Sequence, residues 1–503
     1  MTRQELEFAD PTGRRPARGR SQLFSRGTTT VGNTRRVVAV TVAAILIGLT
    51  ACSRSNPAST TTTSAPEGGG ATSSGAPGNG QFGTLTDPVC GPVPAGQTNT
   101  ASALGVTADS ISIGTISDTG YVGAPGLNQE LFDASHAFAD WCNSLGGING
   151  RAIKLNQLDA KLAEYKQRIL EACATDFALV GGGGVFDDAG QEDRLSCLLP
   201  EFPGYSVTPR ARGAALQVSA LPFPLGAINF GLARYLSDQF PDSVDSVGYI
   251  TGNVPSIITN KDQYQEAGVA LGFNVIYDDQ YNAVGEPTWV PFAQTIKDKG
   301  VRGLFYVGEP TNLGKLLAAL DQIGYRLDWV AGAGNIYDQS LIDSAGAGLS
   351  TNTVYTQTAV TPFLAADLVP AVRQYQELLD KYVPSAKPDA ALGLNSFTAW
   401  LLWAQSAKAC GADLTRACLL QKGSTTTTWE GGGLSALANP SQKTQPPACI
   451  SFQKATADGF SLINWQSDDG VFNCNPANIV DLKADYGRAA SLADVGKTEA
   501  DIK

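Results

Sequence analysis

The chain is poor in histidine, since His136 is the only one among 503 residues. A metal site built from several histidines is therefore excluded, and so is most catalysis in which an imidazole moves a proton. The sequence also contains no GxSxG motif, and His136 falls in the middle of an expected helix. A Ser-His-Asp hydrolase is thus disfavoured, and we expect His136 to be a surface or hydrogen-bonded structural residue.

Positive charge is also scarce. The chain has 36 Lys and Arg residues against 47 Asp and Glu residues, which gives a formal net charge of -11 at pH 7. A surface that binds a nucleic-acid backbone needs clustered Lys and Arg side chains. The sequence therefore predicts that nucleic acids are not partners. Its length and its 43% hydrophobic residues predict two or more lobes with large cores.

The apolar run near the N-terminus is short. Arg35 and Arg36 precede the run Val37–Leu49, which is shorter than the roughly 20 residues that a membrane-spanning helix needs. A short apolar run behind basic residues is typical of an export signal. The run ends in the letters LTAC at Cys52, which resemble the bacterial lipobox. We expect removal of residues 1–51 and lipidation of the cysteine; the alternative is an ordinary signal peptide with a chance cysteine.

The segments on either side of this signal are also informative. The basic leader is long for an export signal, so we hypothesise that translation starts near Val31, at a GTG codon; N-terminal sequencing of the precursor tests this. From Ser53 to about Gly80 the chain is rich in Ser, Thr, Pro, Gly and Ala, and such a segment cannot offset the entropy of ordering its backbone. Residues 52–105 are expected to form a lipidated, flexible tether at the outer face of a cell membrane.

Eight further cysteines indicate disulfides. An even number of cysteines in an exported protein is typical of a disulfide framework. The sequence has no CxxC pair, so a metal cluster is disfavoured, and we expect no cofactor. The pairing cannot be deduced from the sequence. The economical choice joins neighbours, namely Cys173 with Cys197, Cys410 with Cys418 and Cys449 with Cys474, which leaves Cys90 with Cys142.

Short apolar strands alternate with helical patterns along most of the chain. The first strand is expected at Ser110–Gly114, the first helix at Gln129–Leu145 and the second strand at Ala152–Leu158. The stretch GGINGR lies between that helix and that strand. Gly146 or Gly147 can adopt the left-handed conformation that ends a helix, and the Asn-Gly pair suits a tight turn. The glycines therefore predict a sharp return from helix to strand.

The alternation continues along the chain. Further strands are expected at 177–181, 204–208, 246–251, 274–277, 303–307 and 328–331, and further helices at 162–174, 188–198, 230–240, 263–272, 288–299 and 313–324. Repeated units of this kind imply an α/β fold with parallel sheets that helices cover on both faces. Ligands of such sheets lie beyond the carboxyl ends of the strands.

The order of these motifs resembles a known family, the type I periplasmic solute-binding proteins of ABC importers, in particular the leucine/isoleucine/valine-binding proteins. The most specific piece is GGINGRAI, which begins at Gly146. The weaker pieces fall in the expected order: ISIG at Ile111, TG at Thr119, Asp159, VG at Val180, FYVG at Phe305, LL at Leu316 and GY at Gly324. The resemblance covers about residues 106–482.

The resemblance implies two doubly wound parallel-sheet lobes, with three passages of the chain between them and a ligand cleft in the middle. Lobe one would hold residues 106–222 and 350–428, and lobe two residues 223–349 and 429–485, followed by a C-terminal tail at 486–503. The spacing of Cys173 and Cys197 also resembles a disulfide of family members. A lipid anchor suits a Gram-positive-type envelope, from which a free binding protein would diffuse away.

Loops after the strands of lobe one are the expected ligand-binding loops. In amino-acid-binding members, hydroxyls and backbone N–H groups of these loops hold the ligand carboxylate. Such N–H groups suit an anion. The alternative is that the glycines after the third strand merely permit close packing. No Gly-Lys-Ser/Thr follows, which disfavours a P-loop. The matching residues are Gly183, Gly184, Val185 and Phe186 after the third strand and Tyr205, Ser206 and Thr208 after the fourth. Ser117, Asp118, Thr119 and Tyr121, at the end of the first strand, are further candidate ligand-binding residues.

The chain departs from the family pattern where the ammonium group of an amino acid would bind. Members that bind amino acids usually place an acid after the strand that ends near Ala331, but here the letters GAGN follow, ending at Asn335. Glu309 stands where members often have an aromatic residue. It either supplies the missing carboxylate or is an exposed loop residue. Asp118 offers another carboxylate unless it is a helix cap.

Other side chains near the strand ends allow two interpretations of their roles. Trp289, Tyr337 and Tyr121 are candidate walls of the cleft, since apolar side chains dominate such sites, but each taken singly suits a core. Arg210 and Arg212 either pair with an acidic ligand or lie solvated at the surface.

We expect a monomeric, non-enzymatic receptor that hands a small polar solute (an amino acid, an amide or an organic acid) to an ABC permease in the membrane. A ligand-sensing receptor of the same fold, coupled to a membrane signalling protein, is the alternative. An exported hydrolase is disfavoured.

Overall fold

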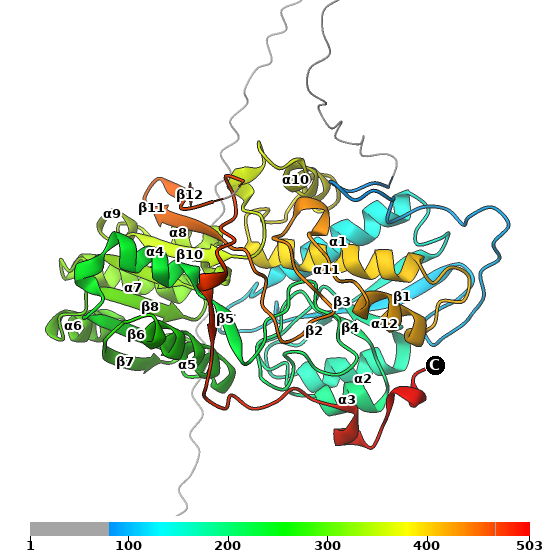
Figure 1. The fold of residues 1–503 in the computed structure, drawn as a ribbon, viewed down its shortest axis with the longest axis horizontal. Helices are drawn as coiled ribbons and strands as arrows, with labels where there is room; N and C mark the ends of the chain where they lie inside the picture. The colour runs from blue at the N-terminus through cyan, green and yellow to red at the C-terminus, as the bar shows by residue number, and fades with distance from the viewer. Residues whose placement is uncertain (1–79, 468) are drawn as a thin grey trace, which may run out of the picture. The chain divides into compact units, whose positions relative to one another are not determined.

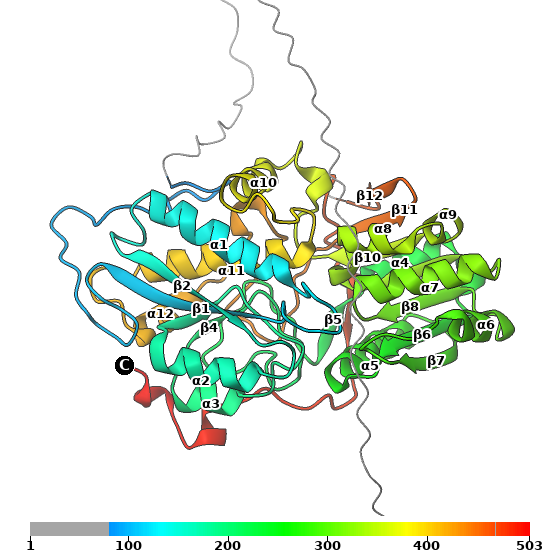
Figure 2. The same cartoon turned by 180° about the vertical axis from the view of Figure 1, so that it is seen from behind.

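The computed structural model describes residues 80–467 and 469–503. The predicted export signal, Cys52 and the tether up to residue 79 lie outside these residues. The described chain builds two α/β lobes, which occupy opposite ends of the views in Figures 1 and 2. Lobe one is built on a four-stranded sheet and lobe two on a seven-stranded sheet.

The sheet of lobe one is parallel throughout, in the order β2-β1-β3-β4. Its strands are β1 Ser110–Ser117, β2 Ala152–Asp159, β3 Ala178–Val180 and β4 Glu201–Phe202. Its helices are α1 Gln129–Ser144, α2 Tyr165–Thr175, α3 Gln191–Ser196, α10 Pro370–Tyr382, α11 Ala391–Lys408 and α12 Arg416–Ser424. Helices α1 and α11 pack on one face and α2 and α3 on the other (Figure 1). The strand expected at 204–208 is instead the loop that follows β4.

The sheet of lobe two has the order β12-β11-β10-β9-β8-β6-β7. Its parallel strands are β6 Val247–Gly252, β7 Val275–Tyr281, β8 Gly303–Val307, β9 Trp329–Gly332 and β10 Val354–Thr358, and its antiparallel edge is β11 Ser451–Thr456 with β12 Gly459–Ile463. Its helices are α4 Gly231–Gln239, α5 Pro255–Ala270, α6 Val290–Asp298, α7 Pro310–Gln322, α8 Gln339–Ala345 and α9 Gly348–Thr351. Leu304 and Tyr306 pack in one apolar cluster and Phe305 in another, because successive side chains of a strand point to opposite faces.

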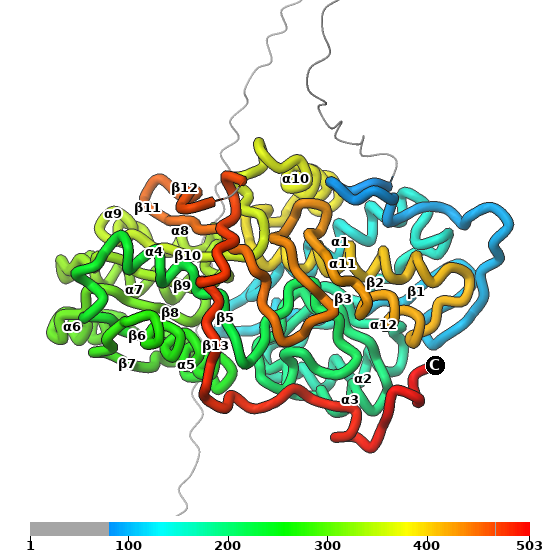
Figure 3. The backbone as a smooth tube through the Cα atoms, viewed as in Figure 1, coloured from blue at the N-terminus to red at the C-terminus, as the bar shows by residue number. Residues whose placement is uncertain are grey.

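Within the described residues the chain passes between the lobes four times. Three of the passages run from β4 to a small sheet of β5 Ala227–Asn229 with β13 Ile479–Asp481, from β10 to α10, and from α12 to β11. The expected boundary at residue 350 is too early, because β10 pairs with β9 in lobe two. The fourth passage is the C-terminal tail, which runs back along lobe one (Figure 3). There Ala490 packs with Leu195 and Ala214.

Residues 80–105 are folded onto lobe one, so the expectation of a tether as far as residue 105 is wrong. Phe82 is fully buried, and its ring lies 5.1 Å from that of Phe397. Cys90 forms a disulfide with Cys142 of α1. The buried aromatic ring and the covalent link offset the conformational entropy that the backbone loses when it is ordered. The small and polar residues of this segment do not by themselves indicate that compensation.

The GGINGR stretch makes the predicted return from α1 to β2. Gly146 and Gly147 both adopt positive φ, at 102° and 75°, and a Cβ atom at Gly147 would collide with the carbonyl oxygen of Arg151. The Arg151 side chain is 1% exposed and donates to the carbonyl oxygens of Thr107 (3.0 Å), Thr100 and Gly411 (both 3.2 Å) and Ala412. The arginine of this motif therefore ties together three separate segments of lobe one.

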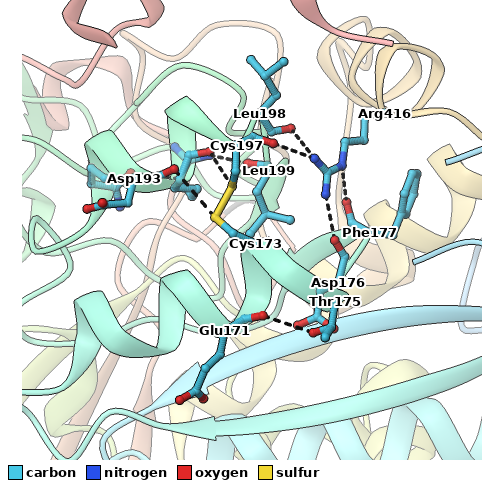
Figure 4. The surroundings of a disulfide bond; sticks show 12 residues. Glu171, Cys173, Thr175, Asp176, Phe177, Asp193, Cys197, Leu198, Leu199 and Arg416 are labelled. Atoms are coloured by element: carbon cyan, nitrogen blue, oxygen red, sulfur yellow. Dashed lines mark hydrogen bonds between the residues drawn. A yellow bond between two sulfur atoms is a disulfide. The ribbon is translucent and has the colours of Figure 1, made fainter. Parts of the chain in front are cut away.

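All four disulfides join the pairs chosen as the most economical. Figure 4 shows Cys173–Cys197, which links α2 to the end of α3. Next to it the guanidinium of Arg416 donates to the carbonyl oxygens of Asp176, Phe177, Cys197 and Leu198 (Figure 4). The disulfide joins α2 to α3, and Arg416 at the start of α12 anchors that helix to the same edge of lobe one.

Candidate ligand-binding cavity

A cavity of about 340 Å³ lies where the carboxyl ends of strands from both sheets meet. Lobe one contributes the loop after β4 and the start of α11, and lobe two contributes α5 and the loops after β8, β9 and β10. This is the position that the alternation of strands and helices predicts for a ligand. The volume falls within the range of small-molecule sites, about 300 to 1,000 Å³.

Most of the cavity wall is apolar. Its hydrophobic side chains come from segments far apart in the sequence: Leu127, Val185, Val207, Leu221, Pro222, Phe223, Ile228, Ile257, Val307, Ala333, Ala359, Ala391, Leu392, Pro446, Pro447 and Ile450. Uncharged polar side chains are interspersed, including Asn128, Tyr205, Gln217, Tyr264 and Asn395. Walls of this kind exclude water from an apolar solute and orient it through a few hydrogen bonds.

Three of the described residues that line the cavity are charged: Arg212, Glu309 and Lys443. Burial lowers the pKa of Arg212 to about 10. Burial likewise lowers the pKa of Lys443, to about 8, and its Nζ donates to the carbonyl oxygen of Ala214 at 2.8 Å. Both shifts record that a cation is held away from water.

Glu309 is the N-cap of α7. Its two carboxylate oxygens accept hydrogen bonds from the backbone N–H groups of Thr311 (2.7 Å) and Asn312 (2.9 Å). Burial raises the pKa of Glu309, and these hydrogen bonds partly oppose the rise. The carboxylate lines the cavity, but it is hydrogen-bonded to the N-terminus of its own helix. It is therefore neither a free partner for an ammonium group nor an exposed loop residue.

Replacing Glu309 with alanine should lower the free energy of unfolding by about 1 to 2 kcal/mol, because two N–H groups of the first turn of α7 lose their acceptor. Urea denaturation measures the change. The matched control is Glu377→Ala on the exposed face of α10, which should stay within about 0.5 kcal/mol of the parent. Equal effects of the two substitutions would contradict the capping role.

Five of the residues expected to bind ligand line the cavity, namely Val185, Tyr205, Ser206, Glu309 and Asn335. The Tyr205 hydroxyl accepts a hydrogen bond from the Asn128 side chain at 2.7 Å, and Ser206 accepts one from Gln217 at 3.2 Å.

Nine other expected ligand-binding residues do not line the cavity: Ser117, Asp118, Thr119, Tyr121, Gly183, Gly184, Phe186, Thr208 and Tyr337. Asp118 is fully buried and accepts hydrogen bonds from the N–H groups of Leu162 (2.9 Å) and Val185 (3.0 Å), so it orders loops behind the wall. The Tyr337 ring packs in the core of lobe one, 5.1 Å from that of Phe363.

The contacts of several other expected residues are packing contacts. Gly183 and Gly184 lie against the rings of Tyr205 and Tyr165, so close packing explains these glycines better than an anion site does. Ser117 donates its hydroxyl to the carbonyl oxygen of Asn128. Phe186 and Thr208 line a separate hollow next to the C-terminal tail. Trp289, the third candidate wall, is buried in lobe two against Tyr281.

Arg212, for which the sequence left open a place beside an acidic ligand or at the surface, is 3% exposed and part of the wall. Other residues of the wall were not expected from the sequence. Tyr264 and Asn395 lie inside helices, where no turn or strand end marks them. Ile257 and Asn260 join Tyr264 at spacings of three and four residues along α5, so the helical period, once α5 was placed at the cleft, was the available signal.

The chain is similar to periplasmic binding proteins in part of its sequence and in its fold. Residues 223–459 match the family model of the periplasmic binding proteins. No curated protein sequence is significantly similar to the chain. Among solved structures, a fatty acid ABC transporter substrate-binding protein from Thermomonospora curvata matches with a TM-score of 0.62 and 18% identity, over 76% of this chain and 100% of the other. The chain has the fold of the type I periplasmic binding proteins.

Two further solved structures have the same type I fold. The branched-chain amino acid transporter substrate-binding protein LivJ from Streptococcus pneumoniae, in complex with isoleucine, matches with a TM-score of 0.57 and 12% identity, over 71% of this chain and 99% of the other. The leucine-binding protein LivK from Thermotoga maritima matches with a TM-score of 0.57 and 13% identity, over 70% and 97%. The predicted α/β class and the resemblance to the type I periplasmic binding proteins are confirmed at the level of the fold.

Two structural findings concern membranes and metals. Among residues 80–467 and 469–503, no helix is both long and apolar enough to cross a bilayer. The same residues contain no group of three or more His, Cys, Asp or Glu side chains arranged to hold a metal ion. His136 forms an exposed pair with Asp140 at 3.2 Å, one helical turn further along α1.

Proposed function

We propose that this protein is the extracytoplasmic substrate-binding lipoprotein of an ABC importer. It captures an amino acid or a related small solute between its lobes and delivers it to a membrane permease, without chemical change of the solute. The observation that carries the proposal is the cavity at the strand ends, whose wall comes from both lobes. A ligand that contacts both lobes stabilises their closed arrangement, because it binds that arrangement best.

The solved structures of the same fold support a solute of this size. Their names specify a fatty acid transporter, a complex with isoleucine and a leucine-binding protein. An aliphatic body is common to these solutes, and the apolar wall of the cavity suits it. Lipidation of Cys52 would keep such a receptor beside its permease.

Calorimetric titration of the full-length protein with amino acids, amides and organic acids should give one-to-one binding of at least one solute. X-ray scattering should show compaction of the protein with the same solute. Deletion of the gene should abolish uptake of that solute, and a Cys52→Ala variant should be released from the membrane fraction. Binding without any loss of uptake would favour the sensory receptor instead, and the absence of both binding and compaction across the panel would reject a solute receptor.

A further inference from the structure

The cavity wall contains a buried cation, Arg212, that forms no ion pair with any of the described residues. The Arg212 guanidinium donates to the carbonyl oxygens of Phe223 (3.0 Å) and Pro224 (2.9 Å) and to the side-chain oxygens of Asn260 (2.8 Å) and Gln263 (2.6 Å). Within the described part of the chain no carboxylate lies within ion-pair distance of it. The positive charge is therefore held by four neutral oxygens and by the ring of Phe223, whose centroid lies 3.8 Å from the guanidinium carbon, while the charge of Asp187 acts on it from beyond ion-pair distance. A closer anion would stabilise it further.

The described wall of the cavity offers no free carboxylate for an ammonium group. Among the described residues that line the cavity Glu309 is the one acidic residue, and both of its oxygens accept hydrogen bonds from backbone N–H groups of α7. Two of the buried carboxylates behind the wall are engaged in the same way. Asp118 accepts from Leu162 and Val185, and Asp187 accepts from two N–H groups of the loop after β4. A zwitterion would bring its ammonium group into this wall uncompensated.

Two polar side chains of the same wall have no hydrogen-bond partner among the described residues. The Tyr264 hydroxyl and the Asn395 side-chain amide both line the cavity, and neither has a hydrogen-bond partner within residues 80–467 and 469–503. Tyr264 lies on α5, one turn beyond Asn260, the side chain that holds Arg212. A carboxylate that approached Arg212 would therefore find a neutral donor on the same helix.

We infer that the solute is an aliphatic monocarboxylate without an α-ammonium group, and that Arg212 recognises its carboxylate. This inference rests on the proposed function. The carboxylate lies toward Arg212 and Tyr264, and the hydrocarbon part lies against side chains such as Ile228, Leu392 and Ile450. At about 30 Å³ per water the cavity holds on the order of ten waters, so the solute has on the order of ten non-hydrogen atoms.

Three compounds with one carbon skeleton test the class of solute: leucine, 4-methylpentanoate and 4-methylpentanamide. A series of linear monocarboxylates of four to ten carbons accompanies them. In calorimetric titrations of the full-length protein, the acid should bind at least 10 times more tightly than both the amide and leucine. Tighter binding of leucine, or equal binding of the acid and the amide, would overturn the inference.

Substitution of Arg212 tests its role. Arg212→Met should remove the preference for the acid over the amide, so that the two dissociation constants differ by less than about threefold. The matched control is Arg210→Met, two residues away, where the arginine pairs with Glu192 and Asp494 outside the cavity. This control should keep the preference. A preference that survives Arg212→Met would overturn the role of Arg212. If the variant does not fold, the three-compound comparison on the parent protein decides.

Failure of this inference differs from failure of the proposed function. If an amino acid, amide or sugar from a broad panel binds and compacts the protein while the monocarboxylates do not, the class of solute is wrong and the receptor function stands. If no compound binds and no compaction occurs, the receptor function falls and the monocarboxylate falls with it.

Discussion

Replacing Ser219 with tryptophan should raise the dissociation constant of the bound solute at least 100-fold, which is about 2.7 kcal/mol of binding free energy. Ser219 lines the cavity and is half-buried, and its hydroxyl has no hydrogen-bond partner among the described residues. The indole adds about eight non-hydrogen atoms, against a cavity that holds on the order of ten waters. The fold should tolerate the change, because the new ring occupies space that the solute would fill.

Calorimetric titration and thermal unfolding measure the two expectations together. The matched control is Ser350→Trp, at an exposed position of α9 in lobe two, which should leave the affinity unchanged. The melting temperature of both variants should stay within a few degrees of the parent. If Ser219→Trp binds the solute within threefold of the parent, the solute lies elsewhere and the cavity is not the site.

Replacing Arg151 with methionine should lower the free energy of unfolding by about 3 to 5 kcal/mol. The substitution leaves four carbonyl oxygens, those of Thr100, Thr107, Gly411 and Ala412, without their donor. Each buried polar group left unsatisfied costs about 1 to 3 kcal/mol, less where water reaches it. Burial lowers the pKa of Arg151, so the guanidinium is also a charge that these carbonyl oxygens compensate inside the protein.

Urea denaturation with the disulfides intact gives the free energy of unfolding by linear extrapolation. The matched control is Arg373→Met on α10, where the arginine is exposed and pairs with the exposed Asp367. An exposed pair contributes about 0 to 1 kcal/mol, so this variant should differ little from the parent. A loss below 1 kcal/mol for Arg151→Met would show that its hydrogen bonds are replaced by water. Solute affinity should be unaffected, since Arg151 does not line the cavity.

Features that depend on short stretches of chain were predictable. The left-handed turn of Gly146 and Gly147 follows from residues that tolerate positive φ better than others do. The parallel strands and the helices of both lobes follow from hydrophobic periodicity, and the place of the cavity follows from the rule that ligands lie at strand ends. The disulfide pairs agree with the economical choice because three of them join cysteines close in sequence.

Contacts between loop side chains and segments distant in the sequence were not predictable. Residues 80–105 have the composition of a tether, yet Phe82 enters the core of lobe one. The side chains of Arg210 and Arg212 differ in the same way: the first meets the C-terminal tail outside the cavity, and the second meets α5 at the cavity wall. Neither partner is near them in the sequence.

The amino-acid sequence by itself determined the α/β class, the sharp return from α1 to β2 and the edge of the sheets at which a solute can lie, because backbone preferences and the alternation of apolar residues act over a few residues. Only the tertiary structure decided which side chains form the wall. Arg212, Tyr264, Asn395 and Lys443 come together there because the passages of the chain between the lobes bring distant segments to one cavity. Arg212 is buried there without an ion pair to any described residue.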